Sequence, residues 1–156
     1  MRTAIQWLDE YGASHRNPTN EILHWICVPA IEWCVVGLLW ITPFPFAIHA
    51  AHPEINWATL AVLVAAAYYL LLSPRLALGA LAMLLLMLWS VDALSRNAPA
   101  PLWLIFTATF VLAWIGQFIG HAIEGKRPSF FKDLQFLLIG PIWLLSNLYR
   151  RLGIRP

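Results

Sequence analysis

The chain has 156 residues, of which 60% are hydrophobic and only 12% are charged. An ordinary soluble domain is roughly 25% charged, and a water-soluble fold of this size could not bury so much apolar surface. The composition therefore excludes a soluble globular domain and indicates a protein whose solvent is the lipid bilayer. The net charge is only +2, and no basic run carries interleaved aromatic residues, so we expect no nucleic-acid partner.

A short amphipathic helix is predicted at residues 3–12, before the first long apolar segment. The apolar residues of one helical face are Ile5, Leu8 and Tyr11. Because the opposite face is polar, we expect this helix to lie on the membrane surface. A polar, turn-like stretch follows, in which Thr19 or Asn20 can cap the next helix.

Four apolar segments are each close to the ~20 residues that a membrane-spanning helix needs. They cover residues 21–41, 55–72, 76–91 and 101–121. The third is short, with sixteen residues between Arg75 and Asp92. Lipid permits only helices or closed barrels, and these runs lack the alternation of barrel strands. We therefore predict an all-α fold, a polytopic transmembrane helical bundle that forms a single domain over residues 1–156.

A fifth apolar stretch, residues 134–149, is interrupted by Gly140-Pro141. Basic residues flank it on both sides: Lys126, Arg127 and Lys132 before it, and Arg150, Arg151 and Arg155 after it. A full span would place these two groups on opposite sides, which the positive-inside rule disfavours. We favour four spans plus a re-entrant or interfacial fifth segment, with five spans as the alternative. The connection at residues 42–54 has no Lys or Arg and is expected outside.

Three of the five histidines can be placed at one face of the membrane by counting helices. His15 and His24 flank the start of the first segment, and His121 closes the fourth. Four crossings put these three on the same side, whereas His49 and His52 fall in the first connection and are interpreted as solvated. Three imidazoles at one face are what a metal site needs.

Polar side chains accompany these histidines at helical spacing. They are Asn20 and Glu21 beside His24, and Gln117 and Glu124 beside His121. The residues at 117, 121 and 124 form one polar stripe on an apolar helix, which should face the interior of the bundle. We expect the carboxamides and carboxylates to support the histidines. A structural role stays open, because a histidine at a helix end often only caps carbonyls or meets lipid headgroups.

Glu32 lies well inside the first segment, where a carboxyl group is costly unless it is paired or protonated. It is interpreted either as a polar contact within the bundle or as a group that contacts the metal ligands without binding the metal itself.

Two stretches of the chain resemble the Mpo1-like family. The first is His15-Arg16-Asn17-Pro18-Thr19-Asn20-Glu21-Ile22-Leu23-His24, followed by Cys27-Val28-Pro29, and the second is Gln117-Phe118-Ile119-Gly120-His121 with Glu124, Arg127 and Pro128. The resemblance spans nearly the whole chain, including the order of its segments and the proline in the last one.

This resemblance implies an Fe(II)-dependent dioxygenase that shortens 2-hydroxy fatty acids by one carbon with O₂. It implies an iron site at His15, His24 and His121. Glu124 would be either a fourth ligand or a residue that supports the ligands without binding the metal. Arg127 or Lys126 could form an ion pair with the substrate carboxylate. Three neutral imidazoles suit Fe(II) and leave positions open for substrate and O₂. The acyl tail would lie among the Trp-rich helices.

Two other functions remain open from the sequence. One is a non-catalytic membrane protein, for lipid binding or assembly, in which the histidines are structural. The other is a zinc-dependent lipid hydrolase. The brief loops are typical of a bacterial protein, so we expect the inner membrane, contact with membrane lipid, and a site at the cytoplasmic face.

Overall fold

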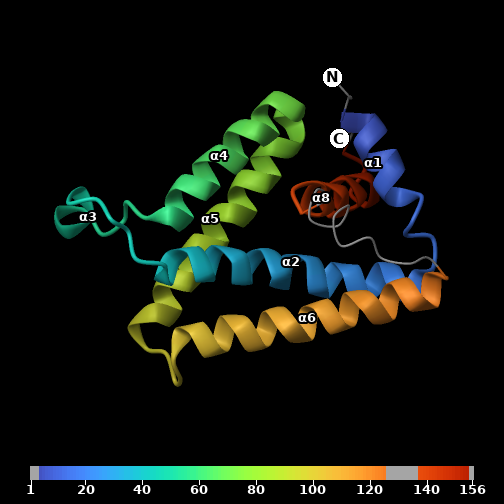
Figure 1. Ribbon diagram of the computed structural model, residues 1–156. Helices are drawn as coiled ribbons and strands as arrows, with labels where there is room; N and C mark the ends of the chain where they lie inside the picture. The colour runs from blue at the N-terminus through green and yellow to red at the C-terminus, as the bar shows by residue number, and fades with distance from the viewer. Residues whose placement is uncertain (1–3, 126–136, 155–156) are drawn as a thin grey trace.

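The computed structural model describes residues 4–125 and 137–154, and the elements in these ranges are helices (Figure 1). In chain order they are α1 (Ala4–Gly12), α2 (Pro18–Ile41), α3 (Ile48–Ala51), α4 (Trp57–Leu72), α5 (Pro74–Arg96), α6 (Leu102–Glu124) and α8 (Ile139–Arg151). The all-α prediction is confirmed for this part of the chain. In Figure 1, α2 and α6 lie side by side and antiparallel, while α4 and α5 form a hairpin that crosses them.

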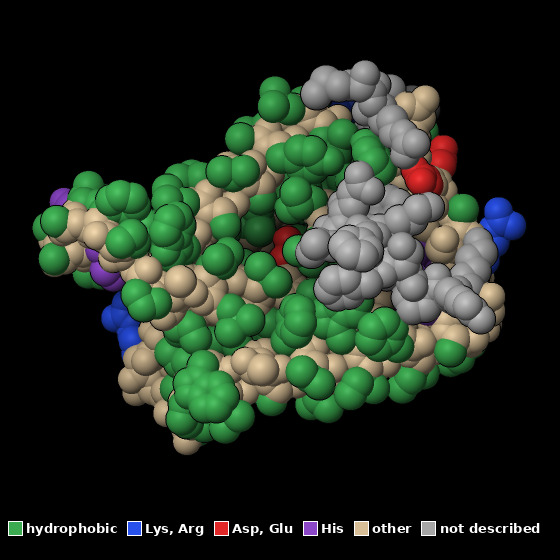
Figure 2. Space-filling view, in the orientation of Figure 1, with side chains coloured by type: hydrophobic (Ala, Val, Ile, Leu, Met, Phe, Trp, Pro, Cys, Tyr) green, Lys and Arg blue, Asp and Glu red, His purple; other side chains and the backbone are tan. Residues whose placement is uncertain are grey.

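Three helices among the described residues are long and apolar enough to cross a membrane: α2, α5 and α6. Helix α4 is also apolar, but its sixteen residues extend only about 24 Å, against a hydrocarbon core of about 30 Å. Large apolar side chains cover much of the visible surface, as Figure 2 shows, which fits a bundle surrounded by lipid. The count of four spans stays a prediction.

Helix α5 is longer than the sequence suggested. It runs from Pro74 to Arg96 and has 23 residues, so the predicted segment of sixteen residues was wrong. The error came from treating Arg75 and Asp92 as the ends of the helix. Arg75 lies in its first turn, and Asp92 pairs with Arg96 one turn later, with 2.8 Å between Oδ2 and Nη2. A charged last turn therefore extends the helix beyond its apolar part.

Helix α2 begins earlier than predicted. Asn17 is its N-cap, with Oδ1 accepting a bond of 2.9 Å from the backbone N–H of Thr19, and Pro18 occupies the first helical position. The prediction of a cap at Thr19 or Asn20 was therefore wrong. As a result, Asn20 lies inside the first turn, where it is fully buried against α6.

Two glycines allow α2 and α6 to approach closely. A Cβ atom on Gly116 would lie 2.6 Å from Sγ of Cys27, and one on Gly120 would collide with Oδ1 of Asn20. Gly116 and Gly120 are four residues apart, the spacing at which small residues commonly mark close helix packing in membranes. This packing brings the start of α2 and the end of α6 together.

Helix α8 begins at Ile139, after a turn at Leu137 and Leu138, so the helix starts next to the predicted interruption at Gly140-Pro141. Pro141 lies in the first turn, where a missing N–H costs no helical hydrogen bond. The thirteen residues of α8 extend about 20 Å, and they pack against α1, α2 and α5. This length supports a fifth segment that does not span. Residues 134–136 of the predicted segment lie outside the described residues.

Helix α1 packs on α8 at the same end of the bundle, through contacts that include Tyr11 and Trp143, whose ring centroids are 5.4 Å apart. Tyr11 is buried, whereas Ile5 from the predicted apolar face is 70% exposed. The location of α1 on a membrane surface stays a prediction. In the structure α1 covers one side of a cluster formed by His15, His24 and His121.

Candidate metal centre

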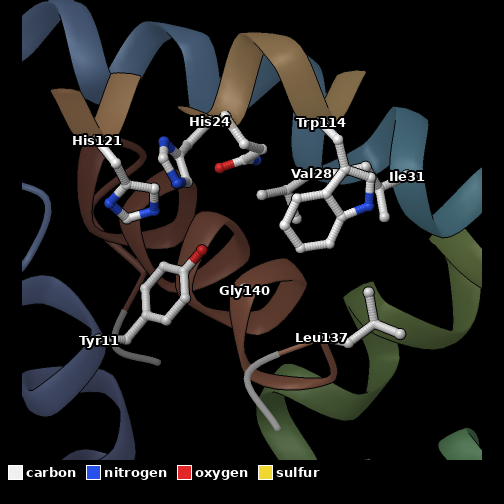
Figure 3. A pocket seen from close by; sticks show the side chains of 9 residues that line it. Tyr11, His24, Val28, Ile31, Trp114, His121, Leu137 and Gly140 are labelled. Carbon is white, nitrogen blue, oxygen red and sulfur yellow. The ribbon is translucent and has the colours of Figure 1, made fainter. Parts of the chain in front are cut away.

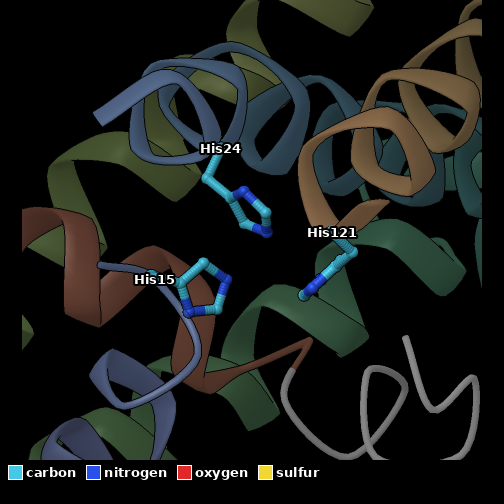
Figure 4. A group of neighbouring side chains, drawn as sticks. All are labelled: His15, His24 and His121. Atoms are coloured by element: carbon cyan, nitrogen blue, oxygen red, sulfur yellow. The ribbon is translucent and has the colours of Figure 1, made fainter. Parts of the chain in front are cut away.

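Three histidines from separate parts of the chain meet where α2 and α6 come together. His15 lies in the connection between α1 and α2, His24 in the second turn of α2, and His121 in the last turn of α6. All three are buried, and one nitrogen from each lies within 4.8 Å of the others. Figure 4 shows the three rings grouped around a common space. Their centroids are 4.1, 5.1 and 5.5 Å apart.

Backbone carbonyls orient two of the three rings. Nδ1 of His15 lies 2.6 Å from the carbonyl oxygen of Tyr11, and Nδ1 of His24 lies 2.9 Å from that of Asn20. A carbonyl oxygen only accepts, so each Nδ1 carries the proton and donates it. Each Nε2 therefore keeps the lone pair that a metal ion binds, an arrangement common among metal-binding histidines.

The donor set fits a first-row metal ion, and the three buried histidines could hold one. Three nitrogens bound to one metal at about 2.1 Å lie roughly 3.0–3.6 Å from one another, depending on the coordination geometry. The nitrogens here lie within 4.8 Å of one another, so side-chain movements on the order of 1 Å would bring them to that range. Three imidazoles suit both iron and zinc, and they leave positions open for further ligands.

Tyr11 supports His15 in two ways that the sequence analysis missed. Its backbone carbonyl accepts a hydrogen bond from Nδ1 of His15. Its ring stacks on the imidazole, with centroids 4.2 Å apart and planes at 12°. Trp143 of α8 packs against the same imidazole, with ring centroids 5.2 Å apart. The amphipathic pattern of residues 3–12 marked Tyr11 only as an apolar residue. The spacing of Tyr11 and His15, four residues, was the available signal.

An apolar pocket opens on one side of the cluster (Figure 3). Its lining consists of Tyr11, His24, Val28, Ile31, Trp114, Gln117, His121, Leu137 and Gly140. The cavity volume is about 40 Å³, enough for small ligands at the histidines but not for a whole lipid chain. In Figure 3 the hydroxyl group of Tyr11 points into this pocket.

A polar cleft lies on the other side of the cluster, between α1, the start of α2 and α8. It is about 620 Å³ in volume, and its lining includes His15, Arg16, Glu21, Arg150 and Arg151. His15 borders the polar cleft, while His24 and His121 border the apolar pocket. The histidines thus stand between a polar and an apolar space. This division suits an amphiphilic ligand.

Glu124 connects the element that carries His15 to the rest of the site. Its Oε1 accepts from the backbone N–H of Arg16 at 3.0 Å, and its Oε2 accepts from that of Asn17 at 2.8 Å and from Nδ2 of Asn20 at 3.1 Å. Among the described residues, the group close enough to share one metal contains the three histidines without Glu124. In this structure the carboxylate fixes the backbone beside His15.

Asn20 and Gln117 lie next to the histidines, as their spacing suggested. The carbonyl of Asn20 accepts from His24, and its Nδ2 donates to the carbonyl of Ser14 at 3.2 Å as well as to Glu124. Gln117 is buried and lines the apolar pocket together with His24 and His121.

Glu21 points toward α8 and the polar cleft. Its Oε1 accepts from Nη2 of Arg151 at 2.8 Å and from Nε1 of Trp25 at 3.4 Å. Its described contacts therefore join the start of α2 to the end of α8.

The other two histidines lie at the far end of α2, around α3 (Figure 1). Nδ1 of His49 donates to the carbonyl of Ile55 at 2.8 Å, and His52 pairs with Glu54 at 3.0 Å. Lys126 and Arg127, the basic residues expected to hold a substrate carboxylate, lie outside the described residues.

The chain matches, over residues 1–152, the family described as 2-hydroxy-palmitic acid dioxygenase Mpo1-like. It belongs to this Mpo1-like family. A relative from Saccharomyces cerevisiae, 2-hydroxy-palmitic acid dioxygenase MPO1, is 30% identical over 151 residues, which are 94% of this chain and 79% of the relative. No solved structure matches the chain. The resemblance inferred from the sequence is confirmed.

The two stretches that resemble the Mpo1-like family are the ones that build the cluster. Residues 15–24 contribute two imidazoles and the N-terminal turn of α2, and residues 117–124 contribute the third imidazole and the carboxylate of Glu124. Asn17, Asn20 and Gly120 also belong to these stretches, and each has a part in joining the two segments.

Proposed function

We propose that this protein is an Fe(II)-dependent dioxygenase that shortens 2-hydroxy fatty acids by one carbon. The observation that carries the proposal is the meeting of three buried histidines between a polar cleft and an apolar pocket. Membership of the Mpo1-like family and the name of the yeast relative support the substrate class and the use of dioxygen.

In this proposal His15, His24 and His121 hold the metal ion. The carbonyl groups of Tyr11 and Asn20 keep two of the rings in the orientation and tautomer that binding requires. Glu124 does not bind the metal in this proposal. It supports the ligands by fixing the backbone between α1 and α2, which carries His15. A bound Fe(II) ion would supply the one-electron chemistry that O₂ requires, together with open positions for a hydroxyl and a carboxylate.

The surroundings of the histidines orient an amphiphilic acid. Val28 and Ile31 provide an apolar path for the first methylene groups of the chain. The carboxylate faces the polar side, where Arg16 lies next to His15, and Lys126 and Arg127 follow α6 in the sequence. The hydroxyl of Tyr11 points into the pocket and is placed to bind an oxygen of the substrate.

The overall reaction balances without a further reductant. A 2-hydroxy acid and one O₂ contain the atoms of the acid one carbon shorter, carbon dioxide and water. The bond between the carboxyl carbon and the hydroxyl-bearing carbon breaks, and the latter becomes the new carboxyl carbon. The 2-hydroxyl group must therefore be present, and a 3-hydroxy isomer would present the wrong carbon–carbon bond.

The proposed setting is a bacterial inner membrane, with the histidine cluster at its cytoplasmic face and the whole chain as one domain. The apolar helices α2, α5 and α6 support the membrane location. A substrate dissolved in the bilayer can then reach the site without crossing water.

Anaerobic purification in detergent, followed by metal quantification, tests the proposal. We expect iron in equimolar amount with the protein, or restored to that amount by added Fe(II). Folded protein that binds no metal would favour a non-catalytic membrane protein. Protein that holds zinc and does not accept iron would favour a metal-dependent hydrolase.

A further inference from the structure

A second pocket lies between α2, α4 and α5, away from the histidines. It is lined by Glu32, Val35, Val36, Leu39, Ala61, Val62, Ala65, Leu84, Leu137 and Leu138, and its volume is about 80 Å³. Figure 2 shows a hollow in the apolar surface on this side of the molecule, with acidic atoms at its floor. The lining is apolar with the exception of one residue, Glu32.

Glu32 is an unusual residue to find in such a lining. It is only 6% exposed, and its Oε2 has no hydrogen-bond partner among the described residues. A buried carboxyl group without a partner costs free energy, and within a membrane segment such a group often marks a binding site. As a neutral acid, Glu32 can donate one hydrogen bond to a group that enters the pocket.

This pocket and the one at the histidines share a wall. Leu137 lines both pockets, and Ile31 of the first is the neighbour of Glu32 of the second on α2. Glu32 follows His24 by eight residues, which is about 12 Å along the helix axis. A chain held at the histidines by its carboxyl end, and lying along α2, reaches Glu32 after roughly ten bonds, because a zigzag chain with C–C bonds of about 1.5 Å advances only about 1.25 Å per bond.

We propose that the two pockets form one acyl-chain site in which Glu32 donates a hydrogen bond to a hydroxyl group near the middle of the chain. The ligand class is a long-chain fatty acid hydroxylated about ten carbons from its carboxyl group. The proposal rests on the proposed function in placing the carboxyl end of the acid at the histidines. Cavity volumes of about 40 and 80 Å³ are too small for a whole long chain, so its end continues into the bilayer.

A binding experiment tests this without turnover. Iron-loaded protein in detergent, kept anaerobic, is titrated with stearate or 10-hydroxystearate against a fluorescent fatty acid. We expect 10-hydroxystearate to bind about three- to tenfold more tightly, as one additional hydrogen bond allows. Glu32→Gln keeps a donor and should preserve this ratio, whereas Glu32→Leu should abolish it. Leu39→Ala, in the same lining, should weaken both acids equally.

Two results would overturn the inference: equal affinities in the unmodified protein, or a preference that survives Glu32→Leu. Lipid analysis adds a third, since a membrane lipid that copurifies with the unmodified protein but not with Glu32→Leu would make that lipid the partner of Glu32. Because the assay measures affinity and not product, its outcome is separate from that of the proposed reaction. A protein with the 10-hydroxy preference but no oxidation would retain the acyl-chain site and lose the proposed function.

Discussion

At the scale of single residues, the two nitrogens of an imidazole have separate tasks in this site. In His15 and His24, Nδ1 donates to a carbonyl four residues earlier, and Nε2 is left to bind a metal. Both partners come from the local backbone, Tyr11 before His15 and Asn20 before His24. The orientation of each ring therefore depends on the short stretch of chain that carries it.

Replacing one histidine of the cluster should remove most of the bound metal. His15→Ala, His24→Ala and His121→Ala each delete one of three ligands, and metal affinity depends on all of them. His49→Ala and His52→Ala are the controls, because both residues lie around α3. Metal content per folded chain, measured by mass spectrometry, checks this. Equal metal in all five variants would remove the site as described.

Glu124→Ala should leave the metal bound but more weakly. The substitution removes the acceptor for Arg16, Asn17 and Asn20, so the backbone beside His15 becomes less ordered. Residues that support metal ligands typically cost about 10- to 100-fold in affinity or activity when they are replaced. Asp92→Ala, which breaks an ion pair on α5, is the control and should change affinity little. Complete loss of metal would instead make Glu124 a ligand.

At the scale of helices, the apolar segments were predictable from the sequence, but several of their ends were not. Arg75 and Asp92 mark the limits of an apolar run, whereas the helix continues past Asp92 because its charge is paired with Arg96. The N-cap at Asn17 was missed because Thr19 and Asn20 also belong to the residue types preferred at N-caps, and only the fold selects among the three positions. Gly140-Pro141 lies in the first turn of α8, where a proline is tolerated, so the pair marks the start of a helix within the apolar stretch.

The close packing of α2 against α6 sets the geometry of the histidine cluster. Gly120→Ala should disturb this packing. The added methyl group would collide with Asn20, whose carbonyl orients His24. Overpacking of this kind typically costs about 1–3 kcal/mol. We expect a lower thermal midpoint together with reduced metal affinity. Ile119→Ala, at an exposed neighbouring position on α6, is the control. A Gly120→Ala variant with unchanged stability and metal binding would contradict this account of the packing.

At the scale of the whole molecule, helix counting predicted that three histidines lie at one face of the membrane. In the structure the three lie together, while the count of four spans stays a prediction. The parts that sequence reasoning could not supply depend on distant contacts. Tyr11 and Trp143 meet His15 because α1 and α8 pack together, and no local pattern in either helix indicates that partner. The pocket around Glu32 likewise needs residues from α2, α4 and α5.

The topology of the bundle gives a prediction about which residues face the same side. In a background without Cys27 and Cys34, single cysteines at Arg16 and Lys126 should react with a membrane-impermeant reagent from the cytoplasmic side. A cysteine at His52 should react only from the other side, because an odd number of crossings separates it from Arg16. Labelling of Arg16 and Lys126 positions from opposite sides would contradict four spans.

The measurement that tests the central claim most directly is the reaction of iron-loaded protein with 2-hydroxypalmitate, followed by mass spectrometry with and without O₂. We expect an acid one carbon shorter, formed only when iron and O₂ are both present. Palmitate and 3-hydroxypalmitate should remain unchanged, because neither has a hydroxyl on the carbon next to the carboxyl group. If protein shown to hold iron at His15, His24 and His121 forms no shortened acid from 2-hydroxy acids of any chain length, the proposed function is wrong.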